Sequence, residues 1–453
     1  MLHKKRYLIL ILGDIFFAYI SLLLTIAFGF WKNFDWEIIF LHLFPFSILY
    51  LLWLLLFYIF DLYNLNIARK KLLFYPRLFG ALGTGGILGT ILFYLVPIFG
   101  ITPKTNLVLN ILFFGILILF WRKFFYSLFS YKLLNNVAIL GLNSISKSLA
   151  QEIITRPYLG YKLKSIYRLK AKPSLSINGV KISIIKNNLL DKIKKEKIDL
   201  LIIADNLRTN SSLMKSMYEC LPTKINFLDL SRAYETICQK IPISFINYGW
   251  FLENLKEGEK TLFDRLKRIF DIVFAFLGLI ITSPLFPLIA ISIKLGDKGP
   301  VFYKQKRVGK NRKPFLIIKF RSMKQGAEKE TGPVFAKKED SRITKVGGFL
   351  RITHLDEIPQ LINVLKGEIS LVGPRPERAN FVEELEKKIP HYHLRHLIKP
   401  GVTGWGQIKF RYARDTFDHF EKFQHDLYYL KNRSFLLDIG IILKTFRMFF
   451  KKP

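Results

Sequence analysis

Four long apolar stretches fill the first quarter of the chain and predict four membrane-spanning helices. They cover about residues 7–30, 38–60, 78–98 and 107–121. Each approaches or exceeds the roughly 17 to 20 residues that a helix needs to cross the hydrocarbon core of a bilayer. The first stretch is too long for a signal peptide and lacks a small-residue cleavage site before Trp31. We therefore expect a four-helix transmembrane domain over residues 1–130.

Basic residues flank these stretches on one side and predict their orientation. The opposite loops offer only Lys32 and Lys104. The positive-inside rule then places the amino terminus, the second loop and everything after the fourth helix in the cytoplasm. Asp14 lies within the first stretch and is either a functional polar site or a partner for another group in the bundle. The one-sided basic residues are Lys4, Lys5, Arg6, Arg69, Lys70, Lys71, Arg77, Arg122 and Lys123.

Between residues 131 and 250 the pattern changes to alternating strands and helices, which predicts a cytoplasmic, Rossmann-like α/β domain. NNVAIL at 135–140 and the buried run within KIDLLIIADN at 197–206 predict strands. Gly141, Asn143 and Ser146 stand where a dinucleotide-binding turn would place three glycines, so only one of the three positions matches. Nucleotide binding and a structural or regulatory role both stay open. Residues 246–262 are expected to be the linker out of this domain.

A fifth apolar segment, residues 272–293, is long enough to span a membrane. Ser283 and Pro284 lie at its centre, where proline removes a backbone donor and breaks or kinks a helix. Both flanks carry basic residues, which marks both ends as cytoplasmic. We expect a re-entrant helix-break-helix over about 266–295, with a kinked spanning helix as the alternative. The flanking residues are Arg265, Lys267, Arg268, Lys294 and Lys298.

Composition agrees with a membrane protein that has cytosolic parts. The 453 residues are 51% hydrophobic, yet they include 69 lysines and arginines and carry a net charge of +35. That charge favours an anionic partner, which is a nucleic acid, an anionic membrane surface or a phosphorylated substrate. Cys220 and Cys238 are far apart and suggest no disulfide or zinc framework, which fits a reducing compartment.

The chemistry is concentrated in GFLRITHLDEIPQLINVLKGEISLVGPRPER at 348–378. Asp356 and Glu357 are adjacent, Arg351 precedes them, and Arg375 follows between two prolines. An aspartate at its ordinary pKa of about 3.9 is ionised at neutral pH and can attack phosphorus without a general base. Two guanidiniums can grip the attacked phosphate. A capping aspartate among surface charges is the alternative.

Two further patterns bear on this site. PFLIIKF at 314–320 predicts a strand, which would point Lys319 and Arg321 to one face, suited to a diphosphate or to a solvated edge. In the same stretch as the acid pair, Pro359 and Gly367 predict the start and the end of a helix.

The histidines and the tail of the chain carry weaker signals. His391, His393 and His396 lack metal-ligand spacing, so we expect a surface segment there. FLLDIGIILKTFRMFF at 435–450 predicts an amphipathic helix, either interfacial or in the core.

Three motifs now carry a family resemblance: KFRSM at 319–323, LDEIPQLINVLKGEISLVGPRPE at 355–377 and KPGVTGWGQ at 399–407. They resemble the bacterial sugar transferase family, the polyprenyl-phosphate hexose-1-phosphate transferases of the monotopic phosphoglycosyl transferase superfamily. The resemblance covers about residues 263–453, within an expected third domain at 251–453 that holds linker, re-entrant helix and α+β catalytic part. The preceding regions are similar to the long form of the family.

The resemblance implies a reaction and roles for matching positions. Asp356 would be the nucleophile and Glu357 its dyad partner, with Mg²⁺ held at this pair. Lys319, Arg321, Arg351 and Arg375 would bind phosphate, and Ser283-Pro284 would be the membrane hinge. A UDP-sugar would be the donor and polyprenyl (undecaprenyl) phosphate the acceptor, with release of UMP. His354 departs from the family, where serine or asparagine is more usual.

The resemblance also implies a setting. This is the cytoplasmic face of the bacterial inner membrane, in contact with membrane lipids, at the first membrane step of exopolysaccharide, capsule or O-antigen synthesis. It allows a homodimer. A non-catalytic scaffold of glycan assembly is the alternative. Nucleic acid is not expected as a partner, since the sequence offers no recognition fold and no basic patch with exposed aromatics.

Overall fold

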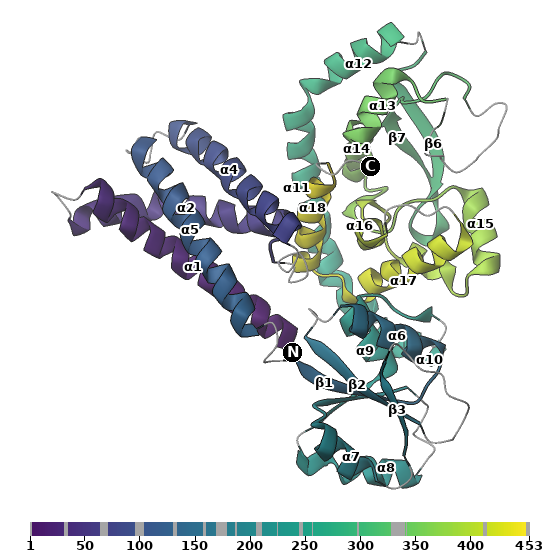
Figure 1. Ribbon diagram of the computed structural model, residues 1–453. Helices are drawn as coiled ribbons and strands as arrows, with labels where there is room; N and C mark the ends of the chain where they lie inside the picture. Colours follow the sequence, from purple (N-terminus) through teal and green to yellow (C-terminus); the bar gives the residue numbers. More distant parts are fainter. Residues whose placement is uncertain are drawn as a thin grey trace. The chain divides into compact units, whose positions relative to one another are not determined.

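The chain divides into two compact units, Met1–Cys238 and Gln239–Pro453, seen in the computed structural model of Figure 1. The expected boundaries at residues 130 and 250 stay predictions. The structure describes residues 2–30, 35–63, 71–95, 104–129, 134–156, 160–168, 179–185, 188–204, 211–223, 225–243, 248–255, 257–296, 299–327, 340, 342–410 and 415–449.

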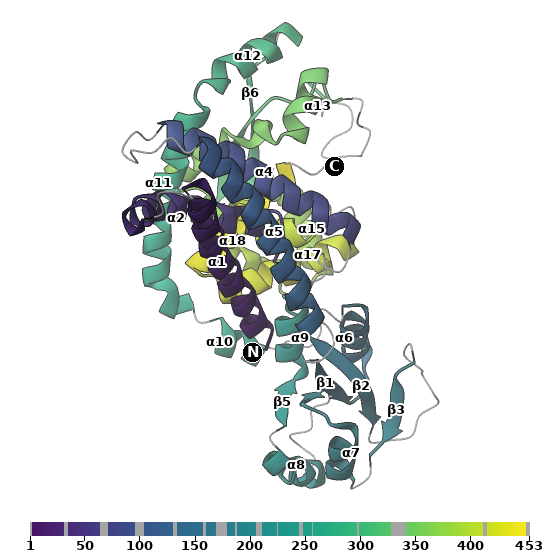
Figure 2. The ribbon, with the colours of Figure 1, turned by 60° about the vertical axis from the view of Figure 1, so that its left-hand side comes forward.

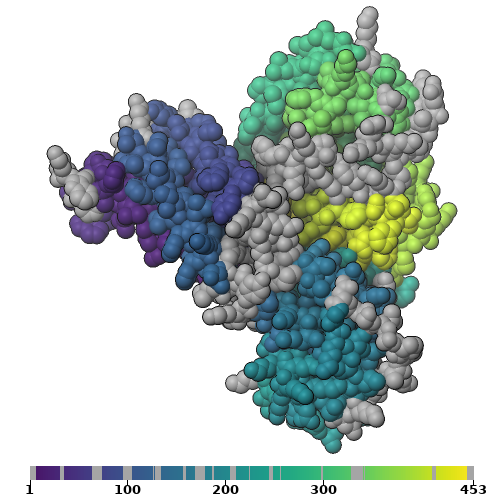
Figure 3. Space-filling model, viewed as in Figure 1, coloured from purple at the N-terminus to yellow at the C-terminus, as the bar shows by residue number. Residues whose placement is uncertain are grey.

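Four helices form the amino-terminal part of the first unit: α1 (Leu2–Gly29), α2 (Trp36–Ile59), α4 (Lys71–Leu95) and α5 (Lys104–Phe129). Each contains a segment long and apolar enough to cross a membrane, so the four predicted apolar helices are confirmed as candidate membrane spans. The helices pack together in Figure 2 and form one purple-to-blue mass in Figure 3. The third helix starts before residue 78 and the fourth extends beyond 107–121, because helical hydrogen bonding continues into the polar flanks.

A buried ion pair joins α1 to α5. Arg122 Nη2 lies 2.6 Å from Asp14 Oδ2, and both side chains are buried. Arg122 Nη1 also donates to the Leu62 carbonyl at 3.0 Å. Asp14 therefore has a partner within the bundle, which is one of the two roles that the sequence allows. Arg122, predicted to be a flanking charge, lies instead in the interior, where pairing offsets the cost of burying both charges.

The rest of the first unit is a five-stranded parallel sheet in the order β3-β2-β1-β4-β5, the order of a doubly wound sheet. Side chains alternate between its faces. Val137 and Ile139 pack with α6 and α9, and Ala138 and Leu140 with α7 and α8. The elements are β1 (Asn135–Leu140), α6 (Ser144–Thr155), β2 (Tyr161–Arg168), β3 (Lys181–Ile184), α7 (Leu189–Glu196), β4 (Leu200–Ile203), α8 (Ser211–Tyr218), β5 (Asn226–Asp229) and α9 (Leu230–Cys238).

The turn after β1 is engaged in starting α6. Gly141 has a φ of 96°, in the left-handed region that favours glycine. Asn143 caps α6 and forms a capping box with Ser146. The Asn143 amide also donates to the Ala204 carbonyl at 3.0 Å. These contacts give all three fingerprint positions a structural role.

The second unit begins with helices where the sequence suggested a linker. α10 (Tyr248–Asn254) buries Phe251, and α11 starts at Thr261. α11 (Thr261–Thr282) and α12 (Leu285–Gly296) are separated by Ser283 and Pro284, and the helical axis bends there by 61°. The predicted helix-break-helix is thus present, while its path through a membrane stays a prediction.

The catalytic part expected from the sequence mixes short strands with helices (Figure 1). β6 (Phe302–Val308) and β7 (Pro314–Phe320) form an antiparallel hairpin, and β8 (Ser370–Val372) pairs in parallel with β9 (Gly401–Thr403). Ile441 of α18 is fully buried in a core with Trp405 and Phe423, which supports the core alternative for the tail helix. The helices are α13 (Lys345–Ile352), α14 (Gln360–Lys366), α15 (Ala379–Lys388), α16 (Trp405–Lys409), α17 (Thr416–Asn432) and α18 (Phe435–Phe449).

Candidate active site

The acid pair lies in a 3₁₀ helix, Leu355–Glu357, between α13 and α14. Pro359 caps α14, and Gly367 ends it with a φ of 83°, so the predicted helix is confirmed and the acids come just before it. His354 precedes the pair in the left-handed region, at a φ of 54°. Asparagine and histidine are among the side chains enriched in that region. Histidine is therefore compatible with the backbone conformation at this position.

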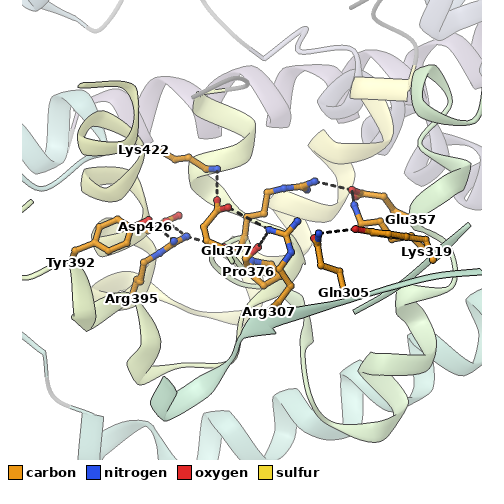
Figure 4. Close-up of polar contacts among 12 residues, drawn as sticks. Gln305, Arg307, Lys319, Glu357, Pro376, Glu377, Tyr392, Arg395, Lys422 and Asp426 are labelled. Atoms are coloured by element: carbon orange, nitrogen blue, oxygen red, sulfur yellow. Dashed lines mark hydrogen bonds and ion pairs between the residues drawn. The ribbon is translucent and has the colours of Figure 1, made fainter. Parts of the chain in front are cut away.

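Two cations hold Glu357 in its charged form. Its Oε1 accepts from Lys319 Nζ at 2.5 Å and from Arg375 Nη2 at 2.9 Å, as Figure 4 shows for the Glu357 and Lys319 side chains. Burial alone would raise its pKa, but Arg375 and Lys319 outweigh burial and hold the pKa of Glu357 far below its usual range. In return, Glu357 raises the pKa of Arg375. The three side chains form one charged unit.

Asp356 is in the opposite state. Its side chain is buried, and no side chain or backbone group in the described part of the chain donates a hydrogen bond to its carboxylate. Burial, assisted by the Glu357 charge, raises the pKa of Asp356 to about 6, although Lys319, Arg351 and Arg375 act to lower it. The ordinary pKa expected for Asp356 is therefore wrong, although a carboxyl group with a pKa of about 6 is still mostly ionised at neutral pH. A carboxylate that is buried and poorly solvated is a stronger nucleophile once ionised, because less hydration must be removed.

The other predicted phosphate-binding residues lie at different distances from this pair. Lys319 lies one residue before the end of β7 and reaches Glu357. Arg321 follows the strand, and its Nη1 lies against Gly299, so close that a Cβ added at Gly299 would be 1.6 Å from it. Arg351, in the last turn of α13, donates from Nε to Ser322 Oγ at 2.9 Å and lowers the pKa of Asp356. Lys319, Arg351 and Arg375 thus meet at the acids.

A second, buried group of charges was missed. Arg307 lies 3.6 Å from Glu377, which also pairs with Lys422 at 3.7 Å, and Arg395 pairs with Asp426 at 3.2 Å (Figure 4). One signal could have shown them: Lys422 and Asp426 recur four residues apart beside Phe423 and Leu427 on one face of α17.

The histidine segment also differs from expectation. Tyr392, Arg395 and His396 are buried, so residues 391–396 do not form the surface segment that the sequence suggested. The segment can be buried because the charge of Arg395 is satisfied inside the fold by Asp426 and the Tyr392 hydroxyl. The Arg395 guanidinium also lies 4.9 Å from the centre of the Tyr392 ring.

The two acids differ in how many carboxylate oxygens they could offer to a magnesium ion. Mg²⁺ usually takes one or two carboxylates together with waters and substrate phosphate oxygens. One oxygen of Glu357 is occupied by two cations, while the Asp356 carboxylate accepts from no donor in the described part of the chain. Within the described residues no cluster of three metal-binding acids, histidines or cysteines occurs. The residues fit an ion held mainly through Asp356 and the substrate.

A family model described as bacterial sugar transferase matches residues 262–452. The UDP-N-acetylgalactosamine-undecaprenyl-phosphate N-acetylgalactosaminephosphotransferase of Aeromonas hydrophila is 46% identical over 182 residues, which are 40% of this chain and 43% of that protein.

Two UDP-glucose:undecaprenyl-phosphate glucose-1-phosphate transferases match more of the chain at 35% identity. The protein from Klebsiella pneumoniae aligns over 70% of this chain and 68% of its own length. The protein from Escherichia coli (strain K12) aligns over 68% of this chain and 66% of its own. The chain thus spans between 43% and 68% of the relatives named here. It belongs to the bacterial sugar transferase family.

Proposed function

We propose that this chain is a phosphoglycosyl transferase that moves a sugar-1-phosphate from a UDP-sugar to a polyprenyl phosphate. The observation that carries the proposal is the contrast between the two acids. Glu357 binds Lys319 and Arg375, and Asp356, free of hydrogen-bond donors in the described part of the chain, lies next to those cations. The relatives support it, since their names describe transfer to undecaprenyl phosphate.

In the proposed first step, an Asp356 carboxylate oxygen attacks the β-phosphorus of the UDP-sugar. A bond forms between that oxygen and phosphorus, and the bond from phosphorus to the bridging oxygen breaks, so UMP leaves with the electron pair. Asp356 then carries an acyl phosphate, a mixed anhydride that keeps the transfer potential of the donor. A serine would give a phosphate ester too stable to pass the group on.

In the second step, a phosphate oxygen of the polyprenyl phosphate attacks the same phosphorus. The bond to Asp356 breaks, the carboxylate is restored, and the sugar is left on a lipid diphosphate. Lys319, Arg351 and Arg375 offset the charge that gathers on the transferred group. Mg²⁺, when bound at Asp356 and the substrate, would supply further charge neutralisation.

The bend at Ser283-Pro284 supports a re-entrant path for α11 and α12. In that arrangement the helices enter the bilayer and return to the cytoplasmic face, where lipid phosphate and nucleotide sugar meet. A cysteine at exposed Lys304, probed with a membrane-impermeant thiol reagent, should label in inside-out membrane vesicles and stay protected in intact spheroplasts. Labelling only in spheroplasts would contradict the proposed topology.

The remaining assignments rest on the resemblance. The setting is the bacterial inner membrane, at the first membrane step of exopolysaccharide, capsule or O-antigen synthesis, and a homodimer is an option. The strand order supports a Rossmann-like assignment for the middle domain. A non-catalytic scaffold is the second candidate, and turnover separates the two.

The test is release of UMP by the purified protein with Mg²⁺, polyprenyl phosphate and a panel of UDP-sugars. Asp356→Asn should abolish release, and the control Asp191→Asn, at an exposed site on α7, should not. Without acceptor, a labelled donor should leave a phospho-sugar on the Asp356 peptide. If no UDP-sugar gives UMP, the scaffold is favoured, and if Asp356→Asn keeps normal turnover, the nucleophile lies elsewhere.

A further inference from the structure

The loop that carries Arg375 is held by its backbone. Four consecutive carbonyl oxygens, those of residues 374–377, each accept a hydrogen bond, and prolines on both sides of Arg375 fix two φ angles. Two of the four donors are arginine side chains, of which Arg395 is buried and Arg307 is half-buried. In the order of their acceptors, the donors are Gly401 N (2.9 Å), Arg395 Nη2 (2.8 Å), Arg307 Nη1 (3.1 Å) and Val308 N (3.0 Å).

Arg395 donates to the carbonyl of Arg375 itself. Its guanidinium is fixed in turn, because Nη1 donates to the Tyr392 hydroxyl at 2.6 Å and Nη2 lies 3.2 Å from Asp426 Oδ2. Figure 4 shows Arg395 between Tyr392 and Asp426, and Arg307 beside Glu377 and Pro376. One rigid fork therefore connects an aromatic hydroxyl, a carboxylate and the backbone of the active-site loop.

Stability alone is a weak reason for this arrangement. Burying an ion pair often adds little or no net stability compared with apolar side chains of similar volume. Yet Arg395 and Asp426 are almost fully buried, at 3% exposure each. The contacts of Arg395 hold the backbone of the loop in one position, in which the Arg375 guanidinium reaches Glu357 Oε1 at 2.9 Å.

We infer that Arg395 is a positioning residue, which sets the place of Arg375 at the acid pair through the Arg375 carbonyl, with Arg307 in the same role one residue later. The inference rests on the proposed function, since it assigns Arg395 to the transfer reaction. Arg395 touches neither acid and acts only through Arg375.

The test uses Arg395→Lys in the full-length enzyme. Lysine keeps the positive charge beside Asp426 but lacks the planar fork that serves three partners at once. The matched control is Arg433→Lys. Arg433 is also buried and pairs with two acids, Glu257 at 2.6 Å and Asp264 at 3.2 Å, but among the described residues it forms no hydrogen bond or ion pair with residues 374–377.

The expected result for Arg395→Lys is a roughly 10- to 100-fold fall in kcat, because small misplacement of an aligned group has effects of that size. The free energy of unfolding, measured on the same samples, separates this loss of kcat from a loss of folded enzyme. Arg433→Lys should leave kcat unchanged.

A double variant sharpens the result. If Arg395 acts through Arg375, adding Arg395→Lys to the Arg375→Ala variant should lower kcat little further. If the two residues act independently, the two fold-losses in kcat should multiply. Arg307→Lys replaces Arg395→Lys if the latter does not fold, with the same expectations. The inference is overturned if kcat of Arg395→Lys matches wild type, if the losses multiply, or if neither variant folds, which would mean a structural role alone. A wild-type enzyme that releases no UMP would instead reject the proposed function.

Discussion

The neighbouring carboxyl groups of Asp356 and Glu357 have pKa values shifted in opposite directions. Glu357 is half-buried with two cations on one of its oxygens, and Asp356 is buried without a hydrogen-bond donor in the described part of the chain. The two cations therefore keep Glu357 strongly ionised, whereas burial raises the pKa of Asp356. Pairs of titratable groups whose environments separate their pKa values often divide the chemical roles between them.

The pH dependence of turnover should report Asp356. Only its ionised form can attack phosphorus, and its pKa is about 6. We expect kcat/KM for the UDP-sugar to be level above about pH 7 and to fall tenfold per unit well below pH 6. A pH-rate profile at fixed ionic strength measures this. An acid limb near pH 4 would mean that the attacking group has an unperturbed pKa.

Stability should respond to the two acids with opposite signs. The pKa of Asp356 is higher in the fold than in the unfolded chain, so its ionisation destabilises the fold as pH rises through that window, and Asp356→Asn should stabilise by roughly 1–3 kcal/mol at pH 7. The pKa of Glu357 is depressed, so its charge stabilises the fold above the unfolded pKa. Glu357→Gln should cost about 1–3 kcal/mol, because the half-buried cations Lys319 and Arg375 lose their carboxylate partner. Denaturant unfolding in detergent compares them, and equal signs would contradict the assignment.

At the scale of elements, α11 holds the segments that carry the site. Arg268 donates to the carbonyls of Val364 and Leu365, the last turn of α14, at 2.5 and 2.7 Å. Asp271 accepts from the Leu371 backbone N–H of β8 at 3.1 Å. α14 follows the acid pair in the chain, and β8 leads into the Arg375 loop. The proposed membrane helix is therefore also the support on which both halves of the site are aligned.

Arg268→Met should show this coupling. It removes the donors from two end carbonyls of α14, and we expect a loss of about 1–3 kcal/mol of stability. A fall in kcat should accompany it, because α14 aligns the acids. Arg265→Met, at an exposed position on the same helix, is the control and should change neither quantity. Thermal unfolding and UMP release measure both. Equal effects of the two variants would reject a specific role for Arg268.

At the scale of the whole molecule, the second compact unit begins before the family match does. The unit starts at Gln239, whereas the match starts at residue 262. The intervening segment contributes Ile241, Ile243 and Phe251 to the core around Trp405. The Gln239 carbonyl accepts from Trp405 Nε1 at 3.1 Å. A segment expected to be mostly linker is thus part of the hydrophobic core of the second unit.

Shortened chains test this boundary. A chain that starts at Gln239 should fold and release UMP in detergent. A chain that starts at Thr261 loses three buried side chains, each worth roughly 1.5–3 kcal/mol, and should unfold or aggregate. Limited proteolysis and UMP release distinguish them. Equal activity of the two chains would show that residues 239–260 are dispensable.

Much of the architecture followed from local patterns. Apolar length predicted four helices, alternation predicted the parallel sheet, and Ser283-Pro284 predicted the break between α11 and α12, because hydrophobic periodicity and proline act over a few residues. The strand with Lys319 and the helix from Pro359 to Gly367 were predicted for the same reason. The sequence also shows directly that Asp356 precedes Glu357 and that Arg375 lies between two prolines.

Contacts between distant residues decided the rest. The sequence by itself determined which groups stand at the site, but the state of each depends on partners far along the chain. Lys319 pairs with Glu357 across 38 residues and Arg122 with Asp14 across 108. Burial raised the pKa of Asp356, and Arg395 proved to be an interior support for Arg375. Desolvation and charge pairing depend on three-dimensional distance, so only the tertiary structure could assign them.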